Sequence, residues 1–328
     1  MNVLLIMPEF FDYPRMIQKA LNDLGYDVDY YNDRPSTNNL VKAIIKVNRN
    51  YMNFFIKRYF KRIMESIKQK KYDVVLLISG QSLSFSVDMI KKLKECQSSA
   101  RYILYQWDAV KNFPCIKEYF IFFDKCYSFD RFDVEQDKRL LFLPLFYTDV
   151  YEKIGNTPKS EYTYDCSYVG TAHPKKYQQI NLVSNALHDL MPRQFIYQYM
   201  PSRLKFIYHK FKDKEFKNAK YKYFQNKKLT TEQIIEIFSE SGCILDAPQS
   251  GQTGLTIRTI ECLGAKRKLI TTNSDIKNYD FYNEQNILIF NGEIDPESSF
   301  FKNGYKDIDE NVYKKYSLQN WLKTMLDS

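Results

Sequence analysis

Hydrophobic and polar positions alternate along the chain in a pattern that predicts strands separated by helices. Six segments of strand length, several of them apolar runs, occur in the first part, at 3–7, 27–31, 73–79, 101–107, 122–128 and 140–144. The first predicted helix, 14–24, begins at a proline and stops before Gly25. Continuous apolar strands separated by helices indicate a parallel sheet that is covered on both faces.

A second series of the same kind follows a polar stretch, 147–164, which we interpret as a linker between domains. Its predicted strands are 166–169, 194–199, 243–246, 268–272 and 287–290. Its predicted helices are 175–190, 234–239, 254–263 and an amphipathic 315–326, and the spacing of Thr230 and Gln233 fits a capping box. The sequence therefore predicts an α/β protein with two Rossmann-like domains whose parallel sheets face a central cleft.

We place the first domain at 1–150, the second at 151–312, and in 313–328 a helix that packs back toward the first domain. A chain of 328 residues is long enough for two such domains.

The charge of the chain favours anionic partners. Its formal net charge of +9 suits a phosphorylated ligand, an anionic membrane surface or nucleic acid. The six cysteines are scattered singly and there are only three histidines, so we expect no zinc site and no disulfide framework. No apolar run reaches the length of a membrane span, and the short run at the start lacks a basic leader. We therefore expect a cytoplasmic protein.

The most informative segment is 250–261, where small residues and glycines lead into a helical pattern. The start of a helix offers free N–H groups to anions, and Arg258 adds a planar fork for phosphate oxygens. Glu261 can accept hydrogen bonds from sugar hydroxyls, so the combination suggests a site for a nucleotide sugar. The alternative is an ordinary helix in which Arg258 and Glu261, three positions apart, pair with each other.

Residues 251–273 (GQTGLTIRTIECLGAKRKLITTN) resemble the carboxyl-domain motif of bacterial GT-B glycosyltransferases, above all the CgeB-like and the lipopolysaccharide and capsule biosynthesis proteins. The resemblance extends over about 100–290, through 127–130, 142–147, 165–171 and 275–282. It implies transfer of a sugar from a nucleotide-sugar donor to a lipopolysaccharide or capsule glycan. No metal or other cofactor is needed if cationic and dipolar groups hold the departing diphosphate.

The resemblance also implies roles for individual residues. Gly254, Leu255 and Thr256 would hold the diphosphate with Arg258, and Glu261 would hold the ribose. Gln252 and Thr253 add donors near the helix start. Gly170, Thr171 and His173, after the first strand of the second domain, would form another phosphate-facing loop, although a plain strand-to-helix turn explains them too.

Three carboxylates after predicted strands of the first domain are candidates for the base that deprotonates an acceptor hydroxyl. Glu9 and Asp12 follow the strand 3–7, and Asp108 follows 101–107. Asp12 can equally cap the helix that begins with Pro14, and Asp108 can cap the next turn. Glu9 and Asp108 lead, and the sequence leaves the choice open.

Basic and aromatic residues interleave in two stretches. In 41–71 they suit a helix resting on an anionic membrane, which predicts a peripheral protein at the inner membrane face, or an amphipathic helix packed on the sheet. The second stretch, 205–228, reads as a surface insertion. Neither belongs to a recognised nucleic-acid module, so we expect no nucleic-acid partner.

Three rival functions remain. A non-catalytic binder of nucleotide or glycan would share the fold, and a basic nucleic-acid-binding protein would share the charge. A dehydrogenase would need a glycine-rich fingerprint after the first strand, which Met7-Pro8-Glu9 lacks.

Overall fold

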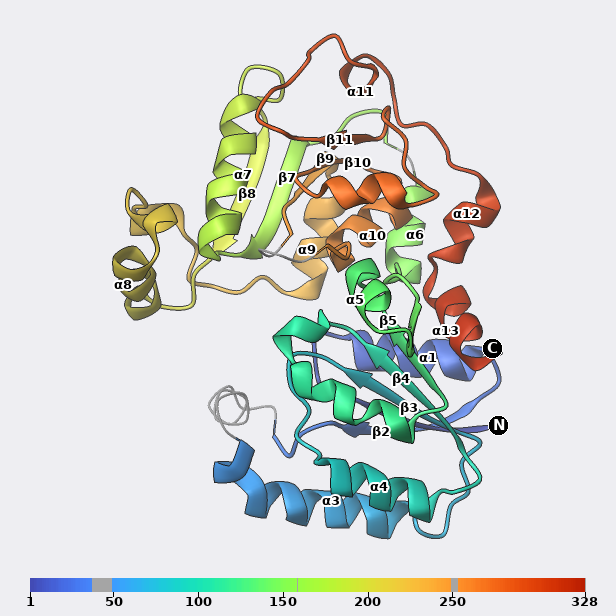
Figure 1. Ribbon diagram of the computed structural model, residues 1–328. Coiled ribbons are helices and arrows are strands. Elements are labelled where there is room, and N and C mark those ends of the chain that lie inside the picture. Colours follow the sequence, from blue (N-terminus) through green and yellow to red (C-terminus); the bar gives the residue numbers. More distant parts are fainter. Residues whose placement is uncertain (37–48, 158, 249–252, 328) are drawn as a thin grey trace. The chain divides into compact units, whose positions relative to one another are not determined.

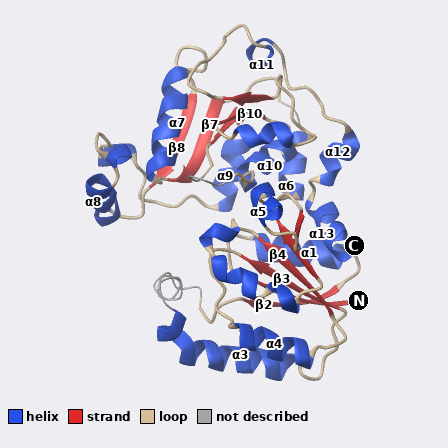
Figure 2. Ribbon diagram, in the orientation of Figure 1, coloured by secondary structure: helices blue, strands red, loops and turns tan. Residues whose placement is uncertain are grey.

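The computed structural model describes residues 1–36, 49–157, 159–248 and 253–327. The chain divides into two compact units (Figures 1 and 2). Unit 1 comprises Met1–Pro144 and Leu318–Ser328, and unit 2 comprises Leu145–Ser317. The boundaries thus fall after 144 and 317, where we had placed them at 150 and 312, and the end of the chain belongs to unit 1.

Unit 1 is built on a six-stranded parallel sheet with the order β2-β1-β3-β4-β5-β6. The strands are β1 (Asn2–Met7), β2 (Asp27–Asn32), β3 (Val74–Ser79), β4 (Arg101–Gln106), β5 (Lys125–Ser128) and β6 (Leu140–Phe142). Its α-helices are α1 (Tyr13–Asp23), α3 (Asn53–Ile67), α4 (Val87–Cys96), α5 (Arg131–Gln136) and α13 (Leu318–Leu326). The short 3-10 helices are η1 (Arg49–Met52), η2 (Val110–Asn112), η3 (Pro114–Glu118) and η4 (Phe120–Phe122).

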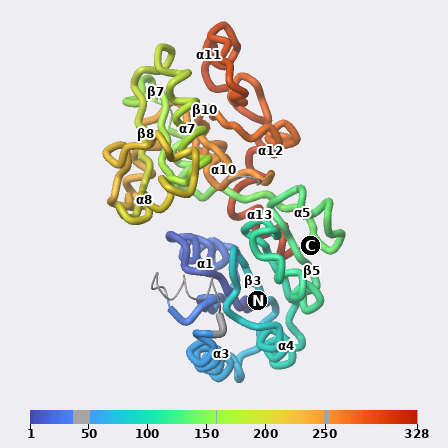
Figure 3. The backbone as a smooth tube through the Cα atoms, turned by 60° about the vertical axis from the view of Figure 1, so that its left-hand side comes forward, coloured from blue at the N-terminus to red at the C-terminus, as the bar shows by residue number. Residues whose placement is uncertain are grey.

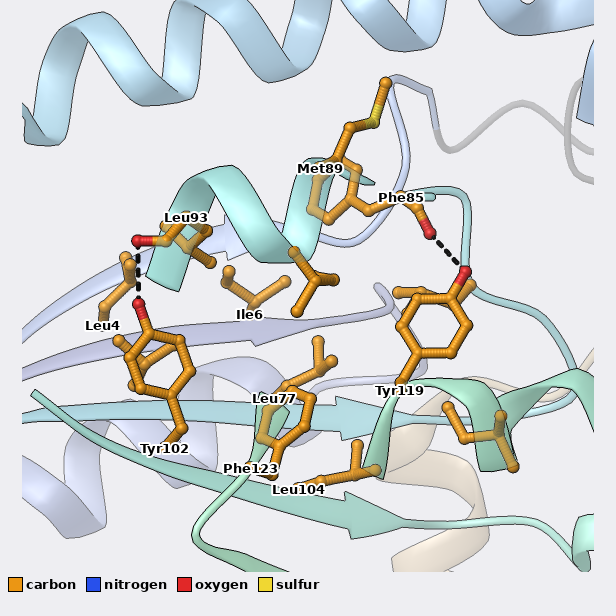
Figure 4. Close-up of a cluster of buried hydrophobic side chains, with 14 of the residues drawn as sticks. Leu4, Ile6, Leu77, Phe85, Met89, Leu93, Tyr102, Leu104, Tyr119 and Phe123 are labelled. Atoms are coloured by element: carbon orange, nitrogen blue, oxygen red, sulfur yellow. Dashed lines mark hydrogen bonds between the residues drawn. The ribbon is translucent and has the colours of Figure 1, made fainter. Parts of the chain in front are cut away.

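Both faces of this sheet are covered, as its continuous apolar strands predict. Helices α3 and α4 lie on one face, while α1 and α13 lie on the other (Figure 1). On the first face, Tyr102 donates its hydroxyl hydrogen to the Leu93 carbonyl at 2.8 Å, and Tyr119 donates to the Phe85 carbonyl at 2.9 Å (Figure 4). These buried phenols keep their polar ends paired inside an otherwise apolar cluster. On the second face, the ring centroids of Trp321 in α13 and Tyr105 in β4 lie 4.7 Å apart.

Unit 2 is built on a five-stranded parallel sheet with the order β11-β10-β9-β7-β8. The strands are β7 (Tyr164–Thr171), β8 (Gln194–Tyr199), β9 (Ser241–Asp246), β10 (Lys268–Thr271) and β11 (Ile287–Ile289). Its α-helices are α6 (Asp149–Gly155), α7 (Pro174–Ala186), α8 (Arg203–Lys212), α9 (Thr231–Ser239), α10 (Ile257–Gly264), α11 (Ser299–Lys302) and α12 (Glu310–Lys315). The 3-10 helices are η5 (Lys214–Phe216), η6 (Tyr221–Tyr223) and η7 (Ser274–Asn278). The predicted capping box of Thr230 and Gln233 is confirmed at the start of α9.

Three sequence-based assignments were wrong in detail. The segment 147–164 is no simple linker, because it contains α6, whose Tyr151 and Ile154 are buried. The helix predicted at 254–263 begins at Ile257, because Thr256 has extended backbone geometry and caps it. The helix predicted at 315–326 begins three residues later, as α13 at Leu318, where unit 1 resumes, and Lys315 is the last residue of the separate helix α12.

Candidate functional site

The start of α10 is fastened to the end of the neighbouring strand β9. Asp246, the last residue of β9, is buried, and its Oδ2 accepts hydrogen bonds from the hydroxyls of Thr256 at 2.7 Å and Thr259 at 3.0 Å. The Thr256 hydroxyl oxygen in turn accepts from the Thr259 N–H at 3.3 Å. The first turn of a helix presents N–H groups that lack intrahelical acceptors. Asp246 therefore fixes the start of α10 at the carboxyl edge of the sheet, and the anion site expected there stays a prediction.

Arg258 and Glu261 form an ion pair on the first turns of this helix. The distance between Nη1 and Oε2 is 2.9 Å, and the side chains expose only 20% and 5% of their surfaces. The guanidinium lies over the Phe238 ring, and its Nη1 donates to the Tyr151 hydroxyl at 3.5 Å. Burial, together with the charge of Glu261, raises the pKa of Tyr151. The pairing that the three-residue spacing allowed is thus present, and the diphosphate and ribose roles of these residues stay predictions.

The loop before α10 is held by a residue that the sequence analysis did not assign. Asn273 follows β10, and its side-chain amide donates to the Thr253 carbonyl at 3.0 Å. Leu255 is buried, which makes it an anchor of the loop. Gln252 lies outside the described residues. The signal for both Asp246 and Asn273 was available in the sequence, since each lies where a predicted parallel strand ends.

The second predicted phosphate-facing loop begins on the adjacent strand. Gly170 and Thr171 are the last residues of β7, and His173 is the N-cap residue of α7, where its carbonyl accepts from the Tyr177 N–H at 2.7 Å. A Cβ atom at Gly170 would lie 2.7 Å from Cζ of Tyr168, so any larger residue would force the buried Tyr168 ring to move. Because β10, β9 and β7 are neighbours in the sheet, the two loops and Asn273 start from one edge of unit 2.

The three candidate bases lie on loops of unit 1. Tyr30 donates its hydroxyl hydrogen to Oε2 of Glu9 at 2.9 Å. Asp12 is the N-cap residue of α1, and its carbonyl accepts from the Met16 N–H at 3.0 Å. Asp108 accepts from the Ala109 N–H at 2.9 Å and from the Asn112 amide at 2.6 Å. Asp12 therefore occupies the N-cap position of α1 without a side-chain cap hydrogen bond. The N-cap residue of η2 is Ala109, so Asp108 lies one residue before that cap.

An ion pair missed from the sequence lies at the same edge of unit 1. Asp33 follows β2, is fully buried, and binds Arg34 through two hydrogen bonds of 2.6 and 2.9 Å. Arg34 also donates to the Ser82 carbonyl at 3.3 Å, which connects the loops after β2 and β3. The pair therefore links two loops at the edge on which the candidate bases lie.

The basic and aromatic stretch 41–71 is described from residue 49 onward, so 41–48 lie outside the description. Ile56, Phe60, Ile63 and Ile67 of α3 are buried on the sheet, as the amphipathic-helix alternative predicts. The exposed aromatic side chains Phe54 and Phe55 lie at the beginning of the same helix. Among the described helices, none combines the length and apolar content that a membrane crossing requires.

No protein-family model matches the chain, and no curated protein matches it. The chain does match solved structures. A glycosyltransferase from Rickettsia africae ESF-5 is 16% identical, with a TM-score of 0.60 over 99% of this chain and 97% of that one. HepE of Anabaena, in complex with UDP and glucose, is 8% identical, with a TM-score of 0.56 over 100% of both chains.

The lipopolysaccharide outer core galactosyltransferase WaaB, in its apo form, is 10% identical, with a TM-score of 0.56 over 100% of this chain and 99% of that one. At such identities the likeness concerns the fold. The chain has the α/β fold of GT-B glycosyltransferases, which confirms the predicted fold class. The narrower resemblance to the CgeB-like group stays a prediction.

Proposed function

We propose that the protein is a glycosyltransferase that moves a sugar from a nucleotide-sugar donor to a lipopolysaccharide or capsule glycan without a metal ion. The observation that carries the proposal is the start of α10, which Asp246 fixes at the strand ends of unit 2 beside Arg258. The fold supports it, because HepE was solved with UDP and glucose and WaaB is named for sugar transfer to a lipopolysaccharide core.

The donor chemistry follows from the residues of this edge. The N–H groups at the start of α10 and the Arg258 fork would bind the diphosphate, and Gly170, Thr171 and His173 would add a second set of contacts. Glu261, held by Arg258, would accept a hydrogen bond from the ribose. Cationic and dipolar groups in fixed positions stabilise the charge that develops on a departing diphosphate, which is how transfer could proceed without a metal.

We assign the catalytic base to Glu9. Asp108 already accepts two hydrogen bonds within its own turn, and Asp12 begins α1, whereas the hydrogen bond from Tyr30 orients the Glu9 carboxylate. Glu9→Gln should lower kcat by about 100-fold or more with little change in the KM for the donor. Asp108→Asn is the matched control, because an amide oxygen can keep both hydrogen bonds. A larger loss in Asp108→Asn than in Glu9→Gln would reverse the assignment.

The donor site is tested by thermal shift with UDP, ADP, GDP and their sugar conjugates, with and without EDTA. We expect stabilisation by one nucleotide family, equal in EDTA, with transfer or slow hydrolysis of its sugar conjugate. If none of these nucleotides raises the melting temperature, the proposed donor site is refuted. Binding without any transfer or hydrolysis would favour the non-catalytic binder, and an EDTA-sensitive activity would contradict the metal-free mechanism.

The acceptor would be reached at the inner face of the membrane through 41–71. Phe54 and Phe55 are exposed on α3 next to Lys57 and Arg58, a combination that suits an anionic bilayer surface. Phe54→Ser with Phe55→Ser should weaken binding to anionic vesicles about 10-fold or more. Ile121→Ser, which removes an exposed apolar side chain of unit 1 outside α3, should leave binding unchanged.

A further inference from the structure

Helix α8 carries a stripe of large apolar side chains that faces away from its own unit. Leu204, Ile207, Tyr208 and Phe211 are all exposed, and Leu204 and Phe211 expose 80% and 89% of their surfaces. Their spacing of i, i+3, i+4 and i+7 places them on one side of the helix. The helix follows β8, the edge strand of the sheet, and lies at the periphery of unit 2 (Figures 1 and 3).

The opposite side of α8 is firmly attached. Phe206 is buried in a small cluster with Phe216 and Phe224, whose ring centroids lie 6.2 and 5.5 Å from its own. Lys210 donates to the Ala219 carbonyl at 3.1 Å, and Asp213 binds Nδ1 of His209 at 2.8 Å. The stripe therefore lies on a helix whose opposite side is packed against unit 2. Its exposure is not the result of a helix that lacks core contacts.

Cations flank the stripe on both sides. At 100° per residue, Arg203 falls on one flank, and Lys205 and Lys212 fall on the other. The Lys212 ammonium donates to the Tyr208 hydroxyl at 2.7 Å, so one cation lies against the edge of the stripe. The segment 203–228 as a whole contains ten lysines and arginines and two acidic residues, a net charge of +8. This surface repels cationic and attracts anionic partners.

We propose that α8 docks unit 2 onto an anionic lipid bilayer, with the apolar stripe inserted among the headgroups and acyl-chain ends and the flanking cations on lipid phosphates. An apolar face flanked by cations has the form of a helix that lies in the plane of a membrane interface. Nucleic acid would satisfy the cations but would leave Leu204 and Phe211 in contact with charged phosphates. This docking does not depend on sugar transfer, and it involves a different unit from the contact at 41–71.

The first experiment is sedimentation of the full chain with vesicles of phosphatidylcholine, with or without phosphatidylglycerol. Leu204→Ser with Phe211→Ser should weaken binding to the anionic vesicles about 10-fold or more. Lys205→Gln and Lys212→Gln should each weaken it about 5-fold. Leu182→Ser, an exposed leucine of α7 in the same unit, is the matched control and should change nothing. Equal binding by the double serine variant and the control would overturn the proposal.

The second experiment separates α8 from any contact made by α3. Phe211→Trp places a fluorophore on the stripe, and brominated acyl chains should quench its emission. The wild-type protein, which retains Phe211, measures the quenching of the two native tryptophans, Trp107 and Trp321, and that contribution is subtracted. The measurement is repeated in the Phe54→Ser, Phe55→Ser background, where quenching should persist. Vesicle binding without quenching of the new tryptophan would overturn the proposal. So would tight, salt-sensitive binding to DNA that weakens in the double serine variant while vesicle binding does not.

Discussion

Removal of Arg258 should destabilise unit 2 before it affects any ligand. The Coulomb attraction between charges 2.9 Å apart is about 6 kcal/mol at an effective dielectric constant of about 20. Loss of one partner from a buried pair costs about 3–5 kcal/mol, because the other charge stays buried alone. Arg258 still exposes 20% of its side chain, so we expect the lower end, about 3 kcal/mol, for Arg258→Ala.

A paired substitution distinguishes this cost from a loss of function. Arg258→Met with Glu261→Gln removes both charges at similar volume and should recover most of the lost stability. Hydrogen exchange of peptides from β9 and α10 reports the stability of unit 2 directly.

Two results would refute this reasoning. An Arg258→Ala protein within about 1 kcal/mol of the wild type would show that the pair behaves as an exposed one. A double variant less stable than Arg258→Ala would show that the remaining glutamate is not the source of the cost. A further outcome is a stable double variant whose melting temperature is no longer raised by the nucleotide that stabilises the wild type. In that case Arg258 or Glu261 contacts the nucleotide.

Three further predictions concern packing and titration. Gly264→Ala should destabilise unit 2 by about 1–3 kcal/mol, because the new Cβ would lie 2.6 Å from Cβ of the buried Tyr147; hydrogen exchange of α10 checks it, and an unchanged rate contradicts it. Leu322→Ala should cost about 2–5 kcal/mol in unit 1, since this side chain of α13 is fully buried; both tryptophans lie in unit 1, so their emission during urea unfolding measures the loss. Burial raises the pKa of Asp133 above 3.8, so its stabilising contribution is present below that pH and is lost as the pH rises through the folded pKa. Asp133→Asn should therefore gain stability relative to the wild type as the pH increases from about 4 to about 7, and a constant difference would show that the carboxyl does not titrate differently in the folded state.

Strands such as β1 and β3 were predictable because each is a continuous apolar run, and such a run needs no tertiary information to be recognised. Every predicted strand corresponds to a strand in the structure, with ends shifted by a few residues. The segment 147–164 was misread because α6 is short, polar on its outer side and ends at Gly155. The start of α13 was predicted three residues too early, at 315, since the apolar periodicity includes Tyr316, whereas the helix begins at Leu318, where unit 1 resumes.

What the sequence determined by itself was the α/β architecture and the chemical character of residues 253–261, because strand patterns, caps and charge spacing are local properties. Only the tertiary structure decided what those residues contact. In the folded chain Asp246 accepts hydrogen bonds from Thr256 and Thr259, and Asn273 donates one to Thr253. Helix α13 belongs to unit 1. The tertiary structure also turned the apolar stripe of α8 outward, because Phe206 on the other side is held in its own cluster. Spacing defines the faces of a helix, and the packing of one face on the rest of the chain decides which face stays exposed.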